Sequence, residues 1–273
     1  MNINKYIPQN PVNLFIEKIL HINMDMQTLY SNQNIFIPNG RIALVIHLKN
    51  SMMLQKKCSS DFLPMMFFVG LLNHYANLKP LGDLTSVFII FKPNALYNLF
   101  KIDMNHLNKC DYINAVDVLG NSAISLYDQL FSVKNADDRF HIIENYFDSY
   151  LHGKVFTVDI IDHIVKRINK DKGCIRVNDI TEYFNIAERT LYHKFMIQTG
   201  LSPKEFIRVI RFENILRHLN KFSYENSYDI INNYDLYDQS HFIKEVKNFT
   251  GHTPKSIVSL NLDLIQAINC TIE

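Results

Sequence analysis

The sequence has few cysteines and no long apolar run, and both shortages exclude classes of protein. Its cysteines lie far apart without a CxxC pair, at Cys58, Cys110, Cys174 and Cys270. This spacing disfavours a zinc site and favours reduced thiols in a cytosolic protein. The longest apolar stretch, around 67–72, has the length of a strand, well below the ~20 residues that span a membrane. The opening residues carry no basic patch followed by an apolar run, so we expect no signal peptide.

The short motifs that carry catalysis are also missing. The sequence contains no GxSxG, no glycine-rich phosphate loop, no HExxH and no paired cysteine and histidine. We therefore predict no catalytic residues and no cofactor, and we expect that the protein is not an enzyme.

The composition is that of a folded protein with almost no net charge. Hydrophobic residues make up 47% of the 273 residues and charged residues 20%, enough for a packed core. The net charge is +1, but residues 154–260 hold 16 Lys and Arg against 13 Asp and Glu, and the remainder 12 against 14. This asymmetry permits a nucleic-acid partner without demanding one.

The first half of the chain reads as short strands followed by a helical hairpin. Branched and aromatic residues between Pro-Asn-Gly and similar breakers predict strands at 35–37, 41–48, 65–72 and 84–91. Such strands are typical of a small β-sandwich or barrel. Helical spacing then predicts two helices, at about 121–131 and 140–151. Their aromatic stripes leave two readings open, a homodimer contact or a cap on the sheet.

The segment 151–159 reads as a linker between two domains. We predict a β-rich domain with the helical hairpin over 1–153 and an all-α domain over 159–260, an α+β two-domain chain. Helical spacing in the second domain predicts helices at 159–170, 177–184, 188–198, 203–219, 227–234, 239–249 and 254–260.

An internal repeat organises this second domain. TGLSPK at 199–204 recurs as TGHTPK at 250–255, an offset of 51 residues that superposes Leu191 on Phe242. Each copy predicts a short helix, a tight turn and a second short helix that ends at a glycine. Asp238 is expected to cap the second helix of the second copy, and Ser202 with Glu205 forms a capping box in the first. This is the pattern of a helix-turn-helix, whose second helix fits the DNA major groove.

The stretch DQSHFIKEVKNFTGHTP at 238–254 resembles the signature of AraC/XylS-type transcription regulators. The resemblance covers about 159–260 and implies two helix-turn-helix units joined by one long helix, here 203–219. It implies a cytoplasmic, sequence-specific DNA-binding regulator, an activator, with double-stranded DNA and RNA polymerase as partners. The sequence departs from the family pattern at Ala187, His193, Asp235, Leu236 and Val246. Asp235 stands where glycine is usual, in a turn whose left-handed backbone Asp tolerates better than most residues.

The resemblance also implies which side chains contact DNA. Base or phosphate contacts are expected from Arg189, Tyr192, His193, Gln239, Ser240, His241 and Lys244. Phosphate contacts are expected from Arg176, Lys204, Arg208 and Lys247, with Arg211 as a further candidate. Each residue taken singly is also a normal solvated surface position.

The N-terminal half more loosely resembles the cupin-like sensor region of one subgroup of these regulators. The resemblance rests on IPNGRIALVIHL, MMFFVGLL and VFIIFKPNA, and it implies a small-molecule effector. Tyr75, Phe88 and Tyr97 either line its pocket or are core aromatics. His47 and His74 invite a metal site, but no HxH pair or third ligand accompanies them, so we predict none.

Two other classes of function stay open at this point. One is a cupin-type metal enzyme with an accessory helical domain. The other is a protein-interaction adaptor that has lost DNA binding, which the departures at His193, Asp235 and Val246 would suit. The effector and the operator are not determined by these residues.

Overall fold

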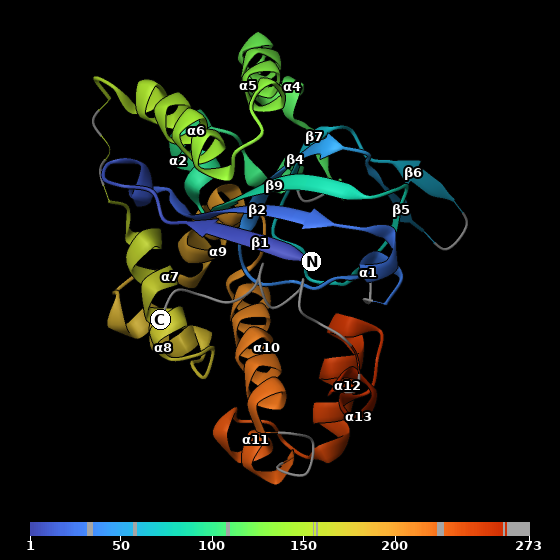
Figure 1. Ribbon diagram of the computed structural model, residues 1–273. Helices are drawn as coiled ribbons and strands as arrows, with labels where there is room; N and C mark the ends of the chain where they lie inside the picture. Colours follow the sequence, from blue (N-terminus) through green and yellow to red (C-terminus); the bar gives the residue numbers. More distant parts are fainter. Residues whose placement is uncertain are drawn as a thin grey trace.

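The computed structural model describes residues 1–31, 35–56, 59–107, 110–154, 156, 158–222, 227–258 and 260. A β-rich region comes first and a helical region second (Figure 1). The strands are β1 (Asn2–Tyr6), β2 (Ile16–Met24), β3 (Ile35–Phe36), β4 (Ile42–Lys49), β5 (Met52–Gln55), β6 (Ser60–Phe62), β7 (Met66–Val69), β8 (Ala76–Pro80), β9 (Leu84–Phe91) and β10 (Ile113–Asn114). The helices among them are α1 (Met26–Ser31), α2 (Ala95–Phe100), α3 (Met104–Leu107) and α4 (Ala115–Leu119).

The strands form two antiparallel sheets. Six strands pair in the order β1-β2-β9-β4-β7-β10, and four in the order β3-β8-β5-β6. In the centre of the larger sheet, Val45 of β4 lies opposite Phe88 of β9 on one side and Phe67 of β7 on the other. All residues of β4 except Lys49 are buried, because both faces of this sheet are covered.

The larger sheet separates two layers of hydrophobic core. On one face, Leu20, Ala43 and Val45 pack toward the four-stranded sheet. On the other face, side chains such as Leu44 and Ile89 pack against helices. The four-stranded sheet and the helices therefore cover opposite faces of the same layer.

The predicted helical hairpin covers the second face. It consists of α5 (Asn121–Ser132) and α6 (Ala136–Leu151), whose buried residues include Leu126, Leu130, Phe140, Ile143 and Phe147. Asn135 caps α6 by accepting a hydrogen bond from the Asp137 N–H. The buried stripes thus cap the sheet, one of the two readings left open by the sequence.

The helices of the C-terminal region begin and end close to the predicted positions. They are α7 (Ile160–Lys170), α8 (Val177–Tyr183), α9 (Glu188–Thr199), α10 (Pro203–Phe222), α11 (Ser227–Asn233), α12 (Gln239–Thr250) and α13 (Pro254–Val258). The largest difference is at α10, which continues three residues beyond the predicted 203–219. The predicted fold class is confirmed: a β-rich region followed by a helical region.

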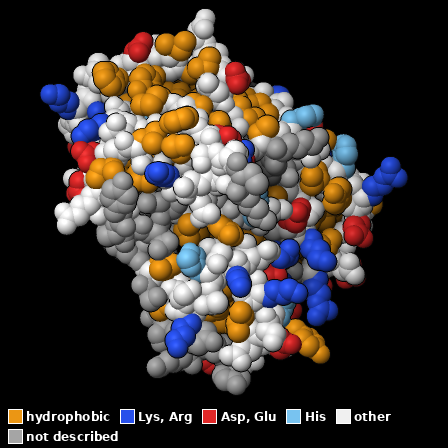
Figure 2. Space-filling model, turned by 90° about the vertical axis from the view of Figure 1, so that its right-hand side faces the viewer, with side chains coloured by type: hydrophobic (Ala, Val, Ile, Leu, Met, Phe, Trp, Pro, Cys, Tyr) orange, Lys and Arg blue, Asp and Glu red, His pale blue; other side chains and the backbone are white. Residues whose placement is uncertain are grey.

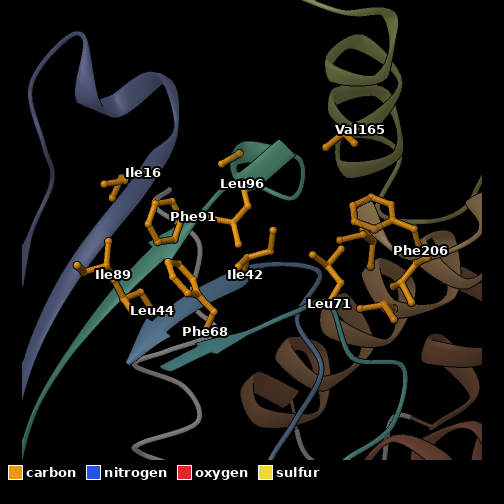
Figure 3. Packing of buried hydrophobic residues seen from close by; sticks show 14 of the residues in the cluster. Ile16, Ile42, Leu44, Phe68, Leu71, Ile89, Phe91, Leu96, Val165 and Phe206 are labelled. Carbon is orange, nitrogen blue, oxygen red and sulfur yellow. The ribbon is translucent and has the colours of Figure 1, made fainter. Parts of the chain in front are cut away.

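Helix α10 is the element against which the other parts pack. Its Phe206 ring contacts Phe195 of α9 at 5.4 Å between centroids, and Phe212 stacks on Phe249 of α12 at 4.6 Å. Figure 3 shows that Phe206 and Val165 continue the core that contains Ile42 and Leu71 of the β-rich region. The two regions therefore share one hydrophobic core.

The loop before β4 approaches α10 closely at Gly40. A Cβ atom at this glycine would lie 2.5 Å from Cδ1 of Ile210, and the residue has a φ of +67°. Both the approach and the left-handed backbone favour glycine here.

A buried ion pair joins the two regions beside this contact. Arg41 of the β-rich region donates from Nη1 to both carboxylate oxygens of Glu213 in α10, each at 2.9 Å, and from Nε to Glu17 of β2 at 2.6 Å. The side chains of Arg41 and Glu213 are only 5% and 2% exposed. Burial opposes the charge on Arg41, but the carboxylates of Glu213 and Glu17 outweigh it and raise the pKa of the guanidinium.

Six strands and the four short helices of the β-rich region are not predicted by the sequence pattern. The missed strands are β1, β2, β5, β6, β8 and β10. In β2 the buried polar residues Lys18 and His21 interrupt the apolar pattern, and β6 and β8 are short and polar. Pairing with neighbours, which composition does not reveal, makes these segments strands.

Removing Glu213 should destabilise the folded chain, because it leaves the buried Arg41 with Glu17 as its one remaining carboxylate partner among the described residues. We expect Glu213→Ala to lower the free energy of unfolding by roughly 3–5 kcal/mol. The double variant Arg41→Met with Glu213→Leu should recover part of that loss, since it removes both fully buried charges and leaves only Glu17, which is 23% exposed, without its partner. Urea unfolding followed by circular dichroism measures both.

The exposed pair between Lys49 and Asp83, 57% and 46% exposed, is the matched control. Lys49→Met should leave the unfolding free energy almost unchanged, because solvent screens such pairs. An equally small effect of Glu213→Ala would contradict a structural role for the buried ion pair.

Candidate DNA-binding surface

Helices α8 and α9 form the first helix-turn-helix unit. The turn between them passes through Asn185, whose φ is +48°, and the Ile186 N–H bonds the Thr181 carbonyl at 3.1 Å. Asn adopts this left-handed backbone more easily than most residues. On α9, Leu191 and Phe195 are fully buried. These residues fix which face of α9 turns toward solvent.

Helices α11 and α12 repeat the arrangement. Asp235 takes the left-handed position with a φ of +52°, and the Leu236 N–H bonds the Ile231 carbonyl at 3.1 Å. The turn therefore forms without the glycine usual in the family, as predicted. Asp238 caps α12 as predicted, accepting from the His241 N–H at 2.7 Å.

The two recognition helices, α9 and α12, also end in the same way. Thr199 and Thr250 are buried, and their hydroxyls donate to the carbonyls of Phe195 and Val246 at 2.8 and 2.7 Å. Each threonine Oγ1 also accepts the backbone N–H two residues later, at 3.3 and 3.0 Å. The repeated threonine thus closes the C-terminus of each recognition helix, a role that the sequence reading did not assign.

The capping box predicted at the start of α10 is present. The Glu205 N–H bonds Oγ of Ser202 at 3.2 Å, and the Ser202 N–H bonds Oε2 of Glu205 at 2.9 Å. In the first unit, Ala187 occupies the N-cap position of α9 without a side-chain hydrogen bond. The first recognition helix therefore begins with a weaker cap than the second.

The predicted DNA-contacting residues of α9 lie on its solvent face. Arg189, Tyr192 and His193 are exposed. The opposite side of α9 packs against the N-terminus of α7. There Gln198 of α9 donates a hydrogen bond to Asp159, the N-cap of α7, at 2.6 Å. Helices α2 and α3 of the β-rich region also contact α9.

The predicted residues of α12 have a similar placement. Gln239, Ser240 and Lys244 are exposed, opposite the buried anchors Phe242 and Val246. His241 is half-buried, with Nε2 3.6 Å from the carboxylate of Glu245. The smaller anchor Val246 is fully buried, so this departure from the family pattern preserves the core position.

One exposed residue of the second unit has no counterpart in the first. From Asn185 to Asp235 the offset between the copies is 50 residues, and from Leu191 to Phe242 it is 51. The extra residue is Tyr237, directly before the Asp238 cap and 91% exposed. The sequence reading did not include it, although the change in offset was a usable signal.

Basic side chains line two adjoining depressions beside the recognition helices, which we call the basic groove. Its Lys and Arg residues are Arg176, Lys204, Arg208, Arg211, Lys244 and Lys247. Figure 2 shows Lys and Arg side chains gathered on the lower half of the molecule. The two depressions share Arg208, His241 and Glu245, and so form one continuous surface between the helix-turn-helix units.

Two of the arginines in the basic groove already have partners within the chain. Arg208 donates to Glu245 at 2.9 Å, and its guanidinium lies 5.6 Å from the centre of the Phe249 ring. Arg211 donates from Nε to the Gly173 carbonyl at 2.9 Å. Arg176, Lys204 and Lys247 are exposed.

A loop of the β-rich region reaches the helix-turn-helix units. Asn73 donates to Oε1 of Glu205 at the start of α10, at 3.0 Å. Burial would raise the pKa of Glu205, but hydrogen bonds from Ser202 and Asn73 hold it below its usual value. Two residues later, Tyr75 packs against Gly251 so closely that a Cβ there would lie 2.8 Å from the ring. The loop at 73–75 therefore contacts both the start of α10 and the end of α12.

The same loop begins and ends in the wall of a cavity between the two sheets. This cavity has a volume of about 70 Å³, and Leu72 and Ala76 are among its lining residues. Of the three aromatic candidates, Phe88 lines it, whereas Tyr97 packs against the core on the other face of the larger sheet. The described residues contain no group of three His, Cys, Asp or Glu side chains arranged to hold a metal ion.

Comparison with known families matches both parts of the chain. A family described as a helix-turn-helix domain matches residues 180–258, and a domain of unknown function, DUF6597, matches residues 4–111. No curated protein matches the chain.

Comparison with solved structures finds ToxT from Vibrio cholerae and the AraC-like CuxR. The wild-type ToxT of strain SCE256 with bound unsaturated fatty acid has 16% identity and a TM-score of 0.47, over 89% of this chain and 95% of that chain. ToxT of strain O395 bound to (E)-4-(8-methylnaphthalen-1-yl)but-3-enoic acid has 17% identity and a TM-score of 0.47, over 88% and 98%. The AraC-like transcriptional activator CuxR has 14% identity and a TM-score of 0.27, over 78% and 86%.

The family match at residues 180–258 identifies the C-terminal part of the chain as the DNA-binding domain of a transcription regulator. The chain carries an AraC-type helix-turn-helix domain in its C-terminal part, so the resemblance seen in the sequence is confirmed there. In the described part of the chain, each helix is too short or too polar to cross a membrane.

The two kinds of side chain on α12 should change DNA binding differently. Lys244→Ala should weaken binding to all sequences and reduce the log–log salt slope by about 0.9, as expected for one lost phosphate contact. Gln239→Ala should instead relax the preference at one or two base pairs, by about 1–3 kcal/mol per lost bidentate contact. Fluorescence anisotropy with operator DNA at several salt concentrations measures both quantities.

Lys134→Ala, an exposed lysine in the loop between α5 and α6, is the control. It should leave the affinity and the salt slope unchanged. If Lys244→Ala and Gln239→Ala behave like this control, the exposed face of α12 is only a solvated surface.

Proposed function

We propose that the protein regulates transcription by placing α9 and α12 in successive major grooves of one DNA face. The observation that carries the proposal is the repeat itself. In each copy buried anchors fix the helix, and the opposite face presents polar side chains, including Arg189 on α9 and Gln239 on α12. Arginine pairs with guanine and glutamine with adenine.

The length of α10 suits this arrangement. Its 20 residues give a helix about 30 Å long. Together with the flanking turns, this length is compatible with recognition helices one turn of B-DNA apart, about 34 Å. Phosphate contacts from Arg176, Lys204, Arg208 and Lys247 of the basic groove would position the protein between the two grooves.

We further propose that the β-rich region controls DNA binding through a small-molecule effector in the cavity. The wall of the cavity continues into the loop at 73–75, which contacts Glu205 and Gly251. A ligand that moves this wall would change how the second helix-turn-helix unit is held. In this proposal the regulator is a cytoplasmic activator that recruits RNA polymerase, as the AraC/XylS resemblance implies, and its two domains meet near 151–158.

A homodimer is part of the proposal. Ile124 and Phe131 of α5 are 50% and 63% exposed, seven residues apart and therefore on one helix face. Figure 1 shows α5 at the end of the molecule remote from α11, so a second copy there would leave α12 accessible. Exposed apolar stripes of this kind mark contact surfaces.

Hydroxyl-radical footprinting on bound genomic fragments tests the DNA-reading proposal. We expect two protected segments about 10 base pairs apart on one face of the DNA. Arg189→Ala should weaken protection at one segment, and Gln239→Ala at the other. A single protected segment, or loss of the same segment in both variants, would contradict insertion of both helices.

Sedimentation of the full chain at about 10 µM tests the homodimer. The wild type should sediment as a dimer of 32.0 kDa chains, and Phe131→Asp as a monomer, because a charge on α5 cannot be buried without a partner. Phe62→Asp, at a phenylalanine of β6 that is 70% exposed, should remain dimeric. A monomeric wild type would rule out this contact.

A further inference from the structure

The cavity between the sheets is almost entirely apolar. Its walls come from both sheets, with Val45, Phe67 and Phe88 on the larger one and Leu54 and Leu78 on the smaller one. Its volume of about 70 Å³ is several times the ~10–15 Å³ that one water occupies on this measure. Water gains little in such a site, whereas an apolar molecule gains burial.

One polar atom in this wall has no partner. His47 lines the cavity and is 1% exposed, and its Nδ1 lies 2.7 Å from Oγ of Ser86 on the neighbouring strand. Its other ring nitrogen, Nε2, is buried and makes no hydrogen bond to the described residues. A buried nitrogen in this state carries a desolvation penalty that a suitable ligand would remove.

The charges around the cavity restrict the ligand. Burial lowers the pKa of His47 to about 4, so its imidazole is neutral near pH 7. The lining includes no Lys or Arg among the described residues, and its one carboxylate, Asp111, pairs with Lys56 at 3.0 Å. An anionic ligand would therefore lose its hydration without meeting a positive partner.

We propose that this cavity binds a neutral, mainly apolar small molecule with one hydrogen-bonding group, such as a phenol or an alcohol, held by Nε2 of His47. In one imidazole tautomer Nε2 accepts a hydrogen bond from the ligand hydroxyl, and in the other it donates one to the hydroxyl oxygen. In either tautomer the second ring nitrogen, Nδ1, keeps its hydrogen bond with Oγ of Ser86. Carboxylates with the same apolar body are excluded. The proposal names the effector class of the proposed function and rests on that function only for its regulatory consequence.

Three probes that share one apolar body test this assignment on the full chain: 4-ethylphenol, ethylbenzene and 4-ethylbenzoate. Isothermal titration calorimetry at pH 7 should show binding of 4-ethylphenol and at least 10-fold weaker binding of 4-ethylbenzoate. The ratio of the 4-ethylphenol and ethylbenzene affinities should fall about 3- to 10-fold in His47→Leu, which removes the hydrogen bond and keeps an apolar side chain. The matched control His152→Leu, at an exposed histidine, should leave the ratio unchanged.

Nitrogen-15 NMR of the His47 imidazole gives a readout that does not depend on a variant. 4-Ethylphenol should shift the Nε2 resonance, and ethylbenzene should shift it much less. The proposal is overturned if 4-ethylbenzoate binds as tightly as 4-ethylphenol, if the affinity ratio is the same in His47→Leu, or if no probe binds at 1 mM.

DNA affinity is measured separately, with and without 4-ethylphenol. Binding of the probe without a change in DNA affinity supports the ligand class and contradicts only the effector role. Absence of DNA binding in every sample contradicts the proposed function alone, because the probe titrations do not involve DNA.

Discussion

The guanidinium of Arg41 is the contact on which the relative position of the two regions depends. It lies between Glu17 of the sheet and Glu213 of α10, and its charge is almost entirely buried. A buried cation tolerates little displacement, because each lost hydrogen bond leaves a charge unpaired. The ion pair therefore adds a directional contact between α10 and the sheet to the close apolar contact of Gly40 with Ile210.

Helix α10 makes contacts on several sides, and its Lys204, Arg208 and Arg211 line the basic groove. It holds α9 through Phe206, α12 through Phe212, and the sheet through Ile210 and Glu213. The sheet region and both helix-turn-helix units therefore contact the same helix. The loop at 73–75 is a second contact between the regions: it meets Glu205 and Gly251 and continues into the wall of the cavity.

The two helix-turn-helix units show how one local pattern is used twice with different surfaces. Both copies contain a buried threonine and a glycine cap, and each turn has a left-handed residue, Asn185 in the first and Asp235 in the second. The exposed positions differ, with Arg189 and Tyr192 in one copy and Gln239 and Lys244 in the other. Tyr237 is an additional exposed residue of the second copy. The buried positions, which the fold requires, are alike in the two copies. The exposed positions, which the fold does not restrict, carry different side chains.

The sequence by itself determined the helical region. Its helix limits depend on contacts between residues three to five positions apart, so they can be predicted from the local sequence. The same holds for the Ser202 capping box, the Asp238 cap and the left-handed glycines. Only the tertiary structure decided the β-rich region and its contacts. Strand β2 forms around Lys18 and His21 because of its neighbours, Arg41 meets Glu213 across 172 residues, and Nε2 of His47 is left without a partner by the way two sheets pack. Such contacts join distant parts of the chain, and local pattern does not specify which distant partners will meet.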